Sequence, residues 1–322
     1  MNRQYSIIIP IYNRPDEIDE LLESLTQQTY KNFEVIVVED GSSLKCDKVV
    51  EKYVHELDIQ YCYKENAGQG FARNYGFERA RGEYFLVFDS DCLLPDTYME
   101  SVNASLNSNF LDAYGGPDKA HDSFTAVQKA INFSLTSTLT TGGIRNKKKA
   151  MGGFEPRSFN MGISRAVFEA TGGYIIPFKG EDIEFSTRIK KMGFSTGLIP
   201  EAFVYHKRRT SWPAFFRQLH FFGTARINIA RYFPEQLKLV HFFPAFFTLG
   251  LALQAILWFL FPKVAEVITV LYGIYFIILF LDALLKTRNL WTSILGIWAA
   301  FLQLTAYGLG FMQELFIRIF KK

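Results

Sequence analysis

The last third of the chain contains three long stretches that are almost free of charged residues, and they limit the possible folds more than any other feature. They run from about 241 to 261, from 264 to 285 and from 290 to 309. A helix needs about 20 apolar residues to cross the hydrocarbon core of a bilayer, and each stretch is of that length. A buried helical core is the alternative, but helices of a soluble core carry a polar stripe, which these almost lack. The sequence therefore predicts a transmembrane helical region over residues 237–322.

The rest of the chain has the charge balance of a soluble protein. Of the 35 Lys and Arg and 32 Asp and Glu, residues 1–236 hold 28 and 29. The net charge of +3 provides no basic field for a nucleic acid. The 3 cysteines form no Cys-x-x-Cys pair and are expected to be free thiols in a reducing compartment. The first apolar run is too short for a signal peptide, so we expect this part to be cytoplasmic.

An amphipathic segment connects the two parts. Between 211 and 226, apolar residues recur at helical spacing and basic residues lie among them: Phe215, Phe216, Leu219 and Phe222 with Arg217, His220 and Arg226. This pattern favours a helix in the membrane interface, and a helix packed on the soluble domain is the alternative. Residues 311–322 repeat the pattern.

The orientation of the tail stays open at this point. Lys286 and Arg288 favour a cytoplasmic loop after the second apolar stretch. Three full spans would then leave the basic C-terminal residues outside, against the same rule. A third stretch that re-enters the membrane or lies partly in the interface would remove the conflict.

Apolar runs and helical patterns alternate in the first part. Runs over 5–12, 33–38, 59–63 and 84–88 read as strands, and the patterns over 16–28 and 70–80 read as helices. Such alternation predicts an α/β fold with a mainly parallel sheet covered by helices on both faces. Ligands of these sheets bind at the carboxyl ends of the strands.

Polar clusters follow three of the predicted strands, at residues 12–13, 39–42 and 89–91. Asp89 and Asp91 can hold a hard divalent cation through oxygen and leave room for phosphate, although a solvated loop also often contains such a pair. The segment 66–76 is rich in glycine but has Arg73 where a dinucleotide fingerprint has its third glycine, which argues against a Rossmann dehydrogenase. Backbone donors at this helix start, together with Arg73, suit a phosphate instead.

Four motifs in this order make the pattern specific. They are Pro10-Ile-Tyr-Asn13, Val38-Glu-Asp-Gly-Ser42, Gly70-Phe-Ala-Arg-Asn-Tyr-Gly76 and Phe88-Asp-Ser-Asp91. Together they resemble the nucleotide-binding half of the family 2 glycosyltransferases, which have the GT-A fold. The likeness continues through Phe159-Asn-Met-Gly-Ile-Ser-Arg165 and Gly180-Glu-Asp182 and covers residues 1–210. The apolar tail fits only the membrane-anchored subset of the family.

The resemblance implies roles for residues on the donor side. Pro10 and Tyr12 would flank the base, and Asp40 would hydrogen-bond the uracil or ribose of a nucleotide sugar, with a UDP-sugar favoured. Asp89 resembles the carboxylate near the ribose and sugar. Asp91 resembles the ligand of a Mn²⁺ or Mg²⁺ ion that bridges the diphosphate.

Further roles follow on the acceptor side. Glu181 and Asp182 resemble the acceptor-side pair, with Asp182 as the favoured base, although either carboxylate can instead cap the helix that begins there. His206 resembles a second metal ligand of some relatives, and a structural histidine is the alternative. The segment 217–222 lacks the Gln-x-x-Arg-Trp motif of processive members, which implies transfer of a single sugar.

These observations predict three regions and one reaction. Residues 1–210 form the catalytic domain, 211–236 the interface helix and linker, and 237–322 about three transmembrane helices. The reaction is an inverting transfer of one sugar to a hydroxyl of a lipid-linked saccharide, in cell-surface glycan synthesis at the inner (plasma) membrane. Transfer to polyprenyl phosphate and an inactive nucleotide-binding scaffold are the alternatives. The lysine run 147–149 is either a solvated loop or a contact for anionic head groups or a lipid diphosphate.

Overall fold

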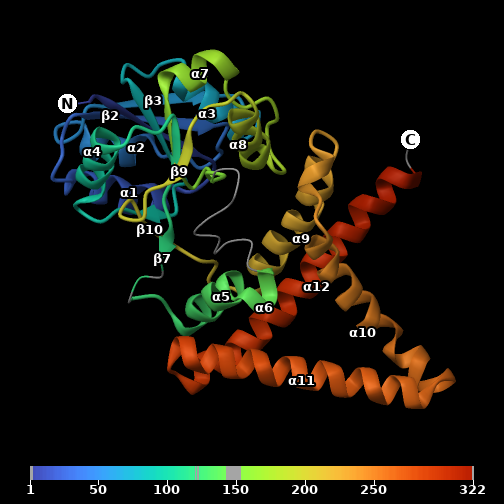
Figure 1. Cartoon of the computed structure of the whole chain (residues 1–322). Coiled ribbons are helices and arrows are strands. Elements are labelled where there is room, and N and C mark those ends of the chain that lie inside the picture. The colour runs from blue at the N-terminus through green and yellow to red at the C-terminus, as the bar shows by residue number, and fades with distance from the viewer. Residues whose placement is uncertain (1–2, 120, 122, 143–153, 321–322) are drawn as a thin grey trace. The chain divides into compact units, whose positions relative to one another are not determined.

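The computed structural model describes residues 3–119, 121, 123–142 and 154–320, so the lysine run 147–149 lies outside the described residues. The chain forms two compact units. Figure 1 colours the chain by residue number and labels its helices and strands. The sheet unit comprises Met1–His121 and Lys148–Lys207, and the helical unit comprises Asp122–Lys147 and Arg208–Lys322.

The segment 122–147, expected in the catalytic domain 1–210, thus belongs to the helical unit. The cause is the apolar face of its helix, where Ala130 and Ile131 are buried together with residues of the tail. The functional boundaries at 210 and 236 stay a prediction.

Two sheets form the centre of the sheet unit. The larger has the strand order β3-β2-β1-β4-β8-β6-β9, and the smaller has the order β5-β10-β7. The strands are β1 (Tyr5–Ile11), β2 (Phe33–Asp40), β3 (Ile59–Lys64), β4 (Tyr84–Phe88), β5 (Cys92–Leu93), β6 (Ala113–Gly115), β7 (Asp118–Lys119), β8 (Asn160–Ser164), β9 (Thr196–Leu198) and β10 (Val204–His206). The helices are α1 (Pro15–Thr26), α2 (Asp47–Val50), the 3-10 turn η1 (Glu51–Tyr53), α3 (Gln69–Phe77), α4 (Tyr98–Ser108), α7 (Arg165–Thr171) and α8 (Glu181–Lys191).

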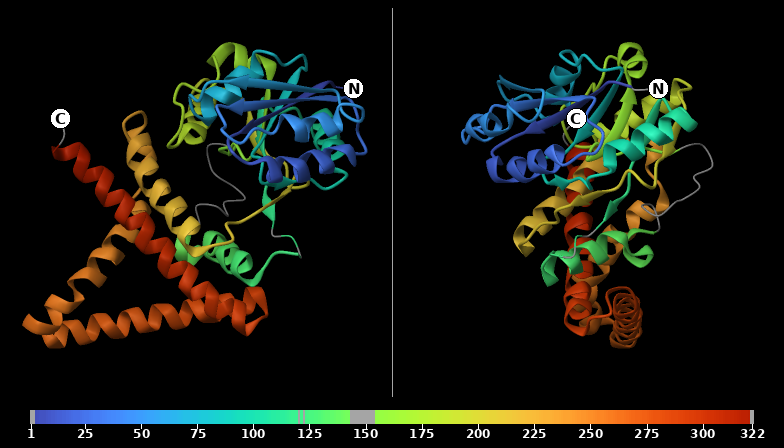
Figure 2. Two further views of the ribbon diagram at one scale, coloured as in Figure 1. Left: turned by 180° about the vertical axis from the view of Figure 1, so that it is seen from behind. Right: turned by 90° about the vertical axis from the view of Figure 1, so that its left-hand side faces the viewer.

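The first four strands of the sheet are parallel, as the apolar runs predict. Strand β1 pairs in parallel with β2 and β4, and β2 pairs in parallel with β3. Side chains alternate along β1, so that Ile7 and Ile9 join the buried cluster with α1 and α4, whereas Ile8 joins the cluster with α3 and α8. Helices cover both faces (Figure 2). Because β1 is parallel to β2 and to β4, the carboxyl ends of these three strands lie at one edge.

The helical unit holds the apolar tail and the inserted segment. It contains α5 (Ala126–Thr136), α6 (Thr138–Thr141), α9 (Trp212–Ile229), η3 (Pro234–Gln236), η4 (Leu239–Phe242), α10 (Phe243–Leu260), α11 (Pro262–Thr287) and α12 (Leu290–Phe320). Three segments of the described chain are long and apolar enough to cross a membrane, namely Leu239–Leu260, Pro262–Thr287 and Leu290–Phe320.

Two details differ from the expectations for the tail. The third apolar stretch and the amphipathic residues after it form one continuous helix, α12, of 31 residues. Helix α9 buries Phe215 and Leu219 in a cluster with Ala299 and Ala306 of α12. Its apolar face therefore has a protein partner, which the sequence pattern alone does not identify.

Candidate active site

Asp91 and His206 lie side by side at the carboxyl edge of the sheet. Asp91 follows β4 and precedes β5, and the antiparallel pairing of β5 with β10 sets His206 opposite Cys92. The imidazole Nε2 is consequently 3.0 Å from Asp91 Oδ1. The ring of His206 stacks on Phe159, with centroids 5.1 Å apart, which fixes its orientation. The structure thus brings together the two side chains expected to bind a metal.

These two residues fit a divalent cation, and the third candidate ligand beside them does not. The ligand atoms of Asp91, Cys92 and His206 all lie within 4.8 Å of one another. Cys92, however, is fully buried and donates its thiol hydrogen to the Phe159 carbonyl at 3.4 Å. Burial raises the pKa of this thiol well above its ordinary value, so it stays protonated. An oxygen and an imidazole nitrogen are ligands that Mn²⁺ accepts, and a neutral thiol is not.

Arg14 is a member of this cluster that was not expected from the sequence. Its Nη1 lies 3.5 Å from Asp91 Oδ2 and 2.7 Å from Glu17 Oε2. Arg14 directly precedes α1, at the end of the β1 loop, so the parallel pairing of β1 with β4 carries it to Asp91. A basic residue just after the first strand is the only signal for it in the sequence.

Arg73 joins Asp89 to Glu181 across the site. Its side chain is 1% exposed, and its guanidinium donates to Asp89 Oδ1 at 2.8 Å and to Glu181 Oε1 at 3.2 Å. Gln69 also donates to Glu181. The structure sets Arg73 between two carboxylates, and its expected contact with a phosphate stays a prediction. Any contribution of Arg73 to donor binding would then act through Asp89, whose side chain is 36% exposed.

Glu181 and Asp182 begin helix α8 but have different surroundings. Glu181 is 3% exposed, and burial raises its pKa, as does the charge of Asp182, against the pull of Arg73. The Asp182 side chain is 25% exposed; its Oδ1 accepts the Ile183 amide at 2.8 Å and its Oδ2 lies 3.5 Å from Arg157. Of the pair, Asp182 is the carboxylate that an external hydroxyl can reach.

Asp40 organises the loop after β3. Its carboxylate, 4% exposed, accepts the amides of Ala67 at 3.0 Å and Gly68 at 2.9 Å, and Lys64 Nζ lies 2.6 Å away. Gly70 donates its amide to the Pro177 carbonyl. The amides of Ala67, Gly68 and Gly70 are therefore engaged within the protein. The expectation that backbone donors of this segment serve a phosphate does not hold for these three.

The motif Pro10-Ile-Tyr-Asn13 fixes the loop after β1 against the loop after β2. Tyr12 is 52% exposed and free to stack on a planar group, and it follows Pro10 at the end of β1. The next residue, Asn13, has a left-handed backbone with φ of 55°. Its amide donates to Ser42, and its side-chain oxygen accepts the Leu44 amide. The motif therefore fixes the two loops against each other and leaves the Tyr12 ring available.

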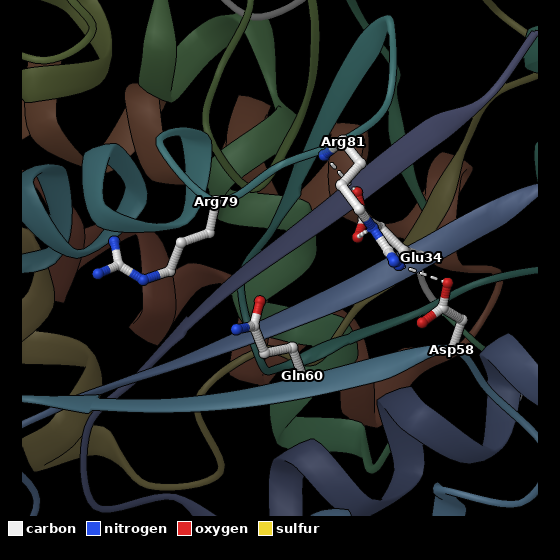
Figure 3. A pocket seen from close by; sticks show the side chains of 5 residues that line it. All are labelled: Glu34, Asp58, Gln60, Arg79 and Arg81. Atoms are coloured by element: carbon white, nitrogen blue, oxygen red, sulfur yellow. Dashed lines mark hydrogen bonds and ion pairs between the residues drawn. The ribbon is translucent and has the colours of Figure 1, made fainter.

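A hollow near the amino ends of β2 and β3 is remote from these residues. Figure 3 shows its lining: Glu34, Asp58, Gln60, Arg79 and Arg81. Arg81 pairs with Glu34 at 2.7 Å and with Asp58 at 2.5 Å. Burial raises the pKa of Glu34, but hydrogen bonds from Ser6 and Arg81 outweigh it, and the net shift is downward. The charges of this hollow are compensated within the protein, and none of the expected site residues lines it.

Known proteins share these sequence and fold features. A family model for glycosyl transferase family 2 matches residues 6–172, more than half of the chain. The chain belongs to this family. An uncharacterized glycosyltransferase of Haemophilus influenzae is 30% identical over 216 residues, which are 64% of this chain and 70% of that protein. One of Rickettsia typhi is 47% identical over 99 residues, and the match spans only 30% of its length.

The structure of the mannosyltransferase PcManGT from Pyrobaculum calidifontis, in complex with GDP-Man and Mn²⁺, has the same fold. The TM-score is 0.68 at 18% identity, and the superposition covers 97% of this chain and 87% of that one. The predicted family and the predicted GT-A fold are both confirmed, and this family 2 member is a glycosyltransferase.

Proposed function

We propose that this family 2 member transfers one sugar from a nucleotide sugar to a hydroxyl of a lipid-linked saccharide, with inversion at the anomeric carbon. The observation that carries the proposal is the Arg73 bridge. It ties Asp89, next to the expected metal ligand Asp91, to Glu181, next to the expected base Asp182. A donor side and an acceptor side are thereby held at a fixed spacing along one edge of the sheet.

On the donor side, Asp91 and His206 would hold Mn²⁺ or Mg²⁺. The bound cation would supply compensation for the charge that develops on the departing diphosphate. Tyr12, with its exposed ring, would stack on the base beside Pro10. The Asp40 carboxylate already accepts hydrogen bonds from the Ala67 and Gly68 amides and pairs with Lys64. It would therefore hold the loop of residues 64–68 in place as well as contact the nucleoside. The resemblance favours a UDP-sugar, and the PcManGT complex with GDP-Man makes a guanine nucleotide the second choice.

On the acceptor side, Asp182 would take the proton of the attacking hydroxyl. It is the more exposed carboxylate of the pair, and its Oδ2 lies 3.5 Å from Arg157 Nη1. Glu181, buried against Arg73 and Gln69, would position the site without touching the acceptor. A single displacement forms the new glycosidic bond as the bond to the diphosphate breaks, so an α-linked donor gives a β-linked product.

In this proposal the enzyme is anchored in the plasma membrane by its apolar helices, with the sheet unit on the cytoplasmic side; the support is the length and apolar composition of these helices. Nucleotide sugars are cytoplasmic compounds, and a lipid-linked acceptor lies in the same membrane. Growth of a cell-surface glycan is a process that uses both.

The test is an assay of the full chain, purified in detergent, with Mn²⁺ and a panel of UDP- and GDP-sugars. We expect release of nucleoside diphosphate from one donor to increase when a membrane lipid extract is added, and the transferred sugar to have the opposite anomeric configuration. Release without any acceptor dependence would indicate hydrolysis, and transfer to polyprenyl phosphate alone would favour the phosphate-directed alternative. With no release from any donor, the inactive scaffold would be the better account.

A further inference from the structure

Helix α12 contacts two amphipathic helices, α5 near its start and α9 along most of its length, from the cluster with Ala299 to Arg318. Near its start, a Cβ added at Gly296 would lie 3.0 Å from the Phe133 ring of α5. Further along, a Cβ added at Gly310 would overlap the His220 carbonyl of α9. At the far end, Arg318 Nη2 donates to Asn228 Oδ1 of α9 at 3.1 Å. Figures 1 and 2 show α9 running beside the second half of α12.

The helices α5 and α9 are both connected to the sheet unit by short segments. Only five residues separate the end of β10 at His206 from the start of α9 at Trp212, and six separate Lys119 of β7 from Ala126 of α5. Six residues reach roughly 25 Å when fully extended, which is less than the ~30 Å hydrocarbon core. Neither connection can therefore carry the chain across a membrane. Both helices begin on the side that holds the sheet unit.

The burial of α12 also differs from that of α10 and α11. Of the most apolar stretch of α12, 50% is buried, compared with 17% for the segment containing α10 and 11% for α11. The buried side is rich in small and polar residues, among them Ser293, Gly296 and Gln303. Trp291 and Trp298 are both exposed. They are two helical turns apart and therefore lie on the same face of α12. The buried side is packed against protein, and tryptophan is enriched where a helix meets the membrane interface.

The basic residues near the two connections of the tail also bear on its orientation. Lys286 lies in the last turn of α11, and Arg288 directly follows the helix. Lys286 Nζ lies 2.9 Å from Asp282 Oδ2, and this same oxygen accepts a hydrogen bond from Ser137, just before α6. Phe261 alone separates α10 from α11, and the basic residue beside it is Lys263 in the first turn of α11. The positive-inside rule therefore assigns the α11–α12 turn to the cytoplasmic side.

We propose that only α10 and α11 cross the membrane, as a hairpin, and that α12 lies in the interface on the side of the sheet unit, flanked by α5 and α9. The exposed face with Trp291 and Trp298 then enters the lipid, and the end of α12 at Arg318 stays on the cytoplasmic side. At ~1.5 Å per residue, α12 would be about 46 Å long, well beyond what a span requires. The proposal rests on the membrane attachment given above and is independent of the proposed reaction.

The test uses single cysteines introduced into the full chain in sealed membrane vesicles of known orientation. The variants are Gln313→Cys late in α12, Lys263→Cys in the hairpin turn and Glu56→Cys in the sheet unit, all at exposed positions. The native thiols are at most 8% exposed, so the wild type gives the background labelling. A membrane-impermeant maleimide is applied to each vesicle orientation, and a carbonate wash checks that the chain is retained.

We expect Gln313→Cys and Glu56→Cys to be labelled from the same side and Lys263→Cys from the opposite side. Labelling of Gln313→Cys from the side of Lys263→Cys would mean that α12 spans the membrane, which overturns the proposal. Labelling of all three from one side would show that the hairpin does not cross. Extraction of the full-length chain by carbonate would refute the attachment itself, and neither result would bear on the sugar-transfer assay.

Discussion

At the scale of single residues, the role of Asp182 can be tested by mutation. The N-cap of α8 is Gly180, so Asp182 lies in the first turn of the helix, where its side chain accepts the Ile183 amide and either stabilises the helix start or acts as the base. The variant Asp182→Asn separates the two, because Asn keeps an oxygen that can accept this amide but cannot take up a proton as a carboxylate does. We expect a thermal stability close to wild type, retained binding of nucleoside diphosphate with Mn²⁺, and a turnover about 10²–10⁴-fold lower. Sugar transfer near the wild-type rate would move the base elsewhere, with Glu181 as the first candidate.

Arg73 has a structural role that a mutation should expose. Because its side chain is 1% exposed and lies between Asp89 and Glu181, Arg73→Met leaves a buried carboxylate uncompensated. Removing one partner of a buried pair costs about 3–5 kcal/mol of stability. Arg79→Met, in the turn just after the helix that carries Arg73, is the control, since Arg79 is 34% exposed and should contribute less than about 1 kcal/mol. The measurement is the unfolding midpoint in detergent, and equal midpoints for both variants would count against the buried bridge.

The lowered pKa of Glu34 predicts that the stability of the folded protein depends on pH. Its pKa is lowered in the folded state, so its stabilisation is present above the unfolded value of about 4.3 and is lost as the pH falls through the folded value. Glu34→Gln should therefore unfold at a lower temperature than wild type at pH 7, and the gap should narrow below about pH 4. Asp58→Asn is the control, because Asp58 faces the same arginine at 63% exposure. A gap for Glu34→Gln that stays constant with pH would contradict this account.

The sequence predicts single site residues better than their partners. Asp91 and His206 are expected as ligands, and they do meet, but only the register of β5 against β10 explains how. Glu181 is 108 positions from Arg73, so no local pattern reveals the bridge between them. Arg14 is missed for the same reason, because parallel pairing of β1 and β4 brings it to Asp91.

At the level of elements, the strands are predictable because each is a short apolar run with a polar end. The run over 84–88 has the bounds of β4, and α8 begins at the expected Glu181. The tail is less predictable. The helical patterns of residues 290–309 and 311–322 do not tell whether the two segments form one helix or two. In the structure they form the single helix α12. The burial of α5 among tail helices depends on tertiary packing that the local pattern does not contain.

The crossing of α9 and α12 depends on glycine. A Cβ at Gly310 would overlap the His220 carbonyl, a backbone atom that can move only if the helices separate. Gly310→Ala should therefore lower the unfolding midpoint, whereas Gly273→Ala in α11, where nothing lies within 4 Å, should leave it unchanged or raise it. Thermal unfolding of both variants in the same detergent is the comparison. A Gly310→Ala variant as stable as Gly273→Ala would show that this close approach does not matter.

At the scale of the whole molecule, the chain combines a GT-A sheet unit with a helical unit built partly from an insertion into it. The chain leaves the sheet unit after His121, contributes α5 and α6 to the helical unit, and returns before β8. The chain therefore passes between the two units three times, after residues 121, 147 and 207, rather than once at residue 210. In the proposed topology all three connections lie on the cytoplasmic side, where a nucleotide sugar is available.

The central claim is that the carboxyl edge of the sheet is a metal-assisted site for a nucleotide sugar, with Asp91 as a ligand. Calorimetric titration of UDP and of GDP into the full chain, with and without Mn²⁺, tests it most directly. We expect Mn²⁺ to strengthen the binding of one nucleotide in the wild type and in Glu34→Gln at the opposite edge, and to have no such effect in Asp91→Asn. Equal strengthening by Mn²⁺ in Asp91→Asn, or nucleotide binding that ignores Mn²⁺ in the wild type, would contradict the claim.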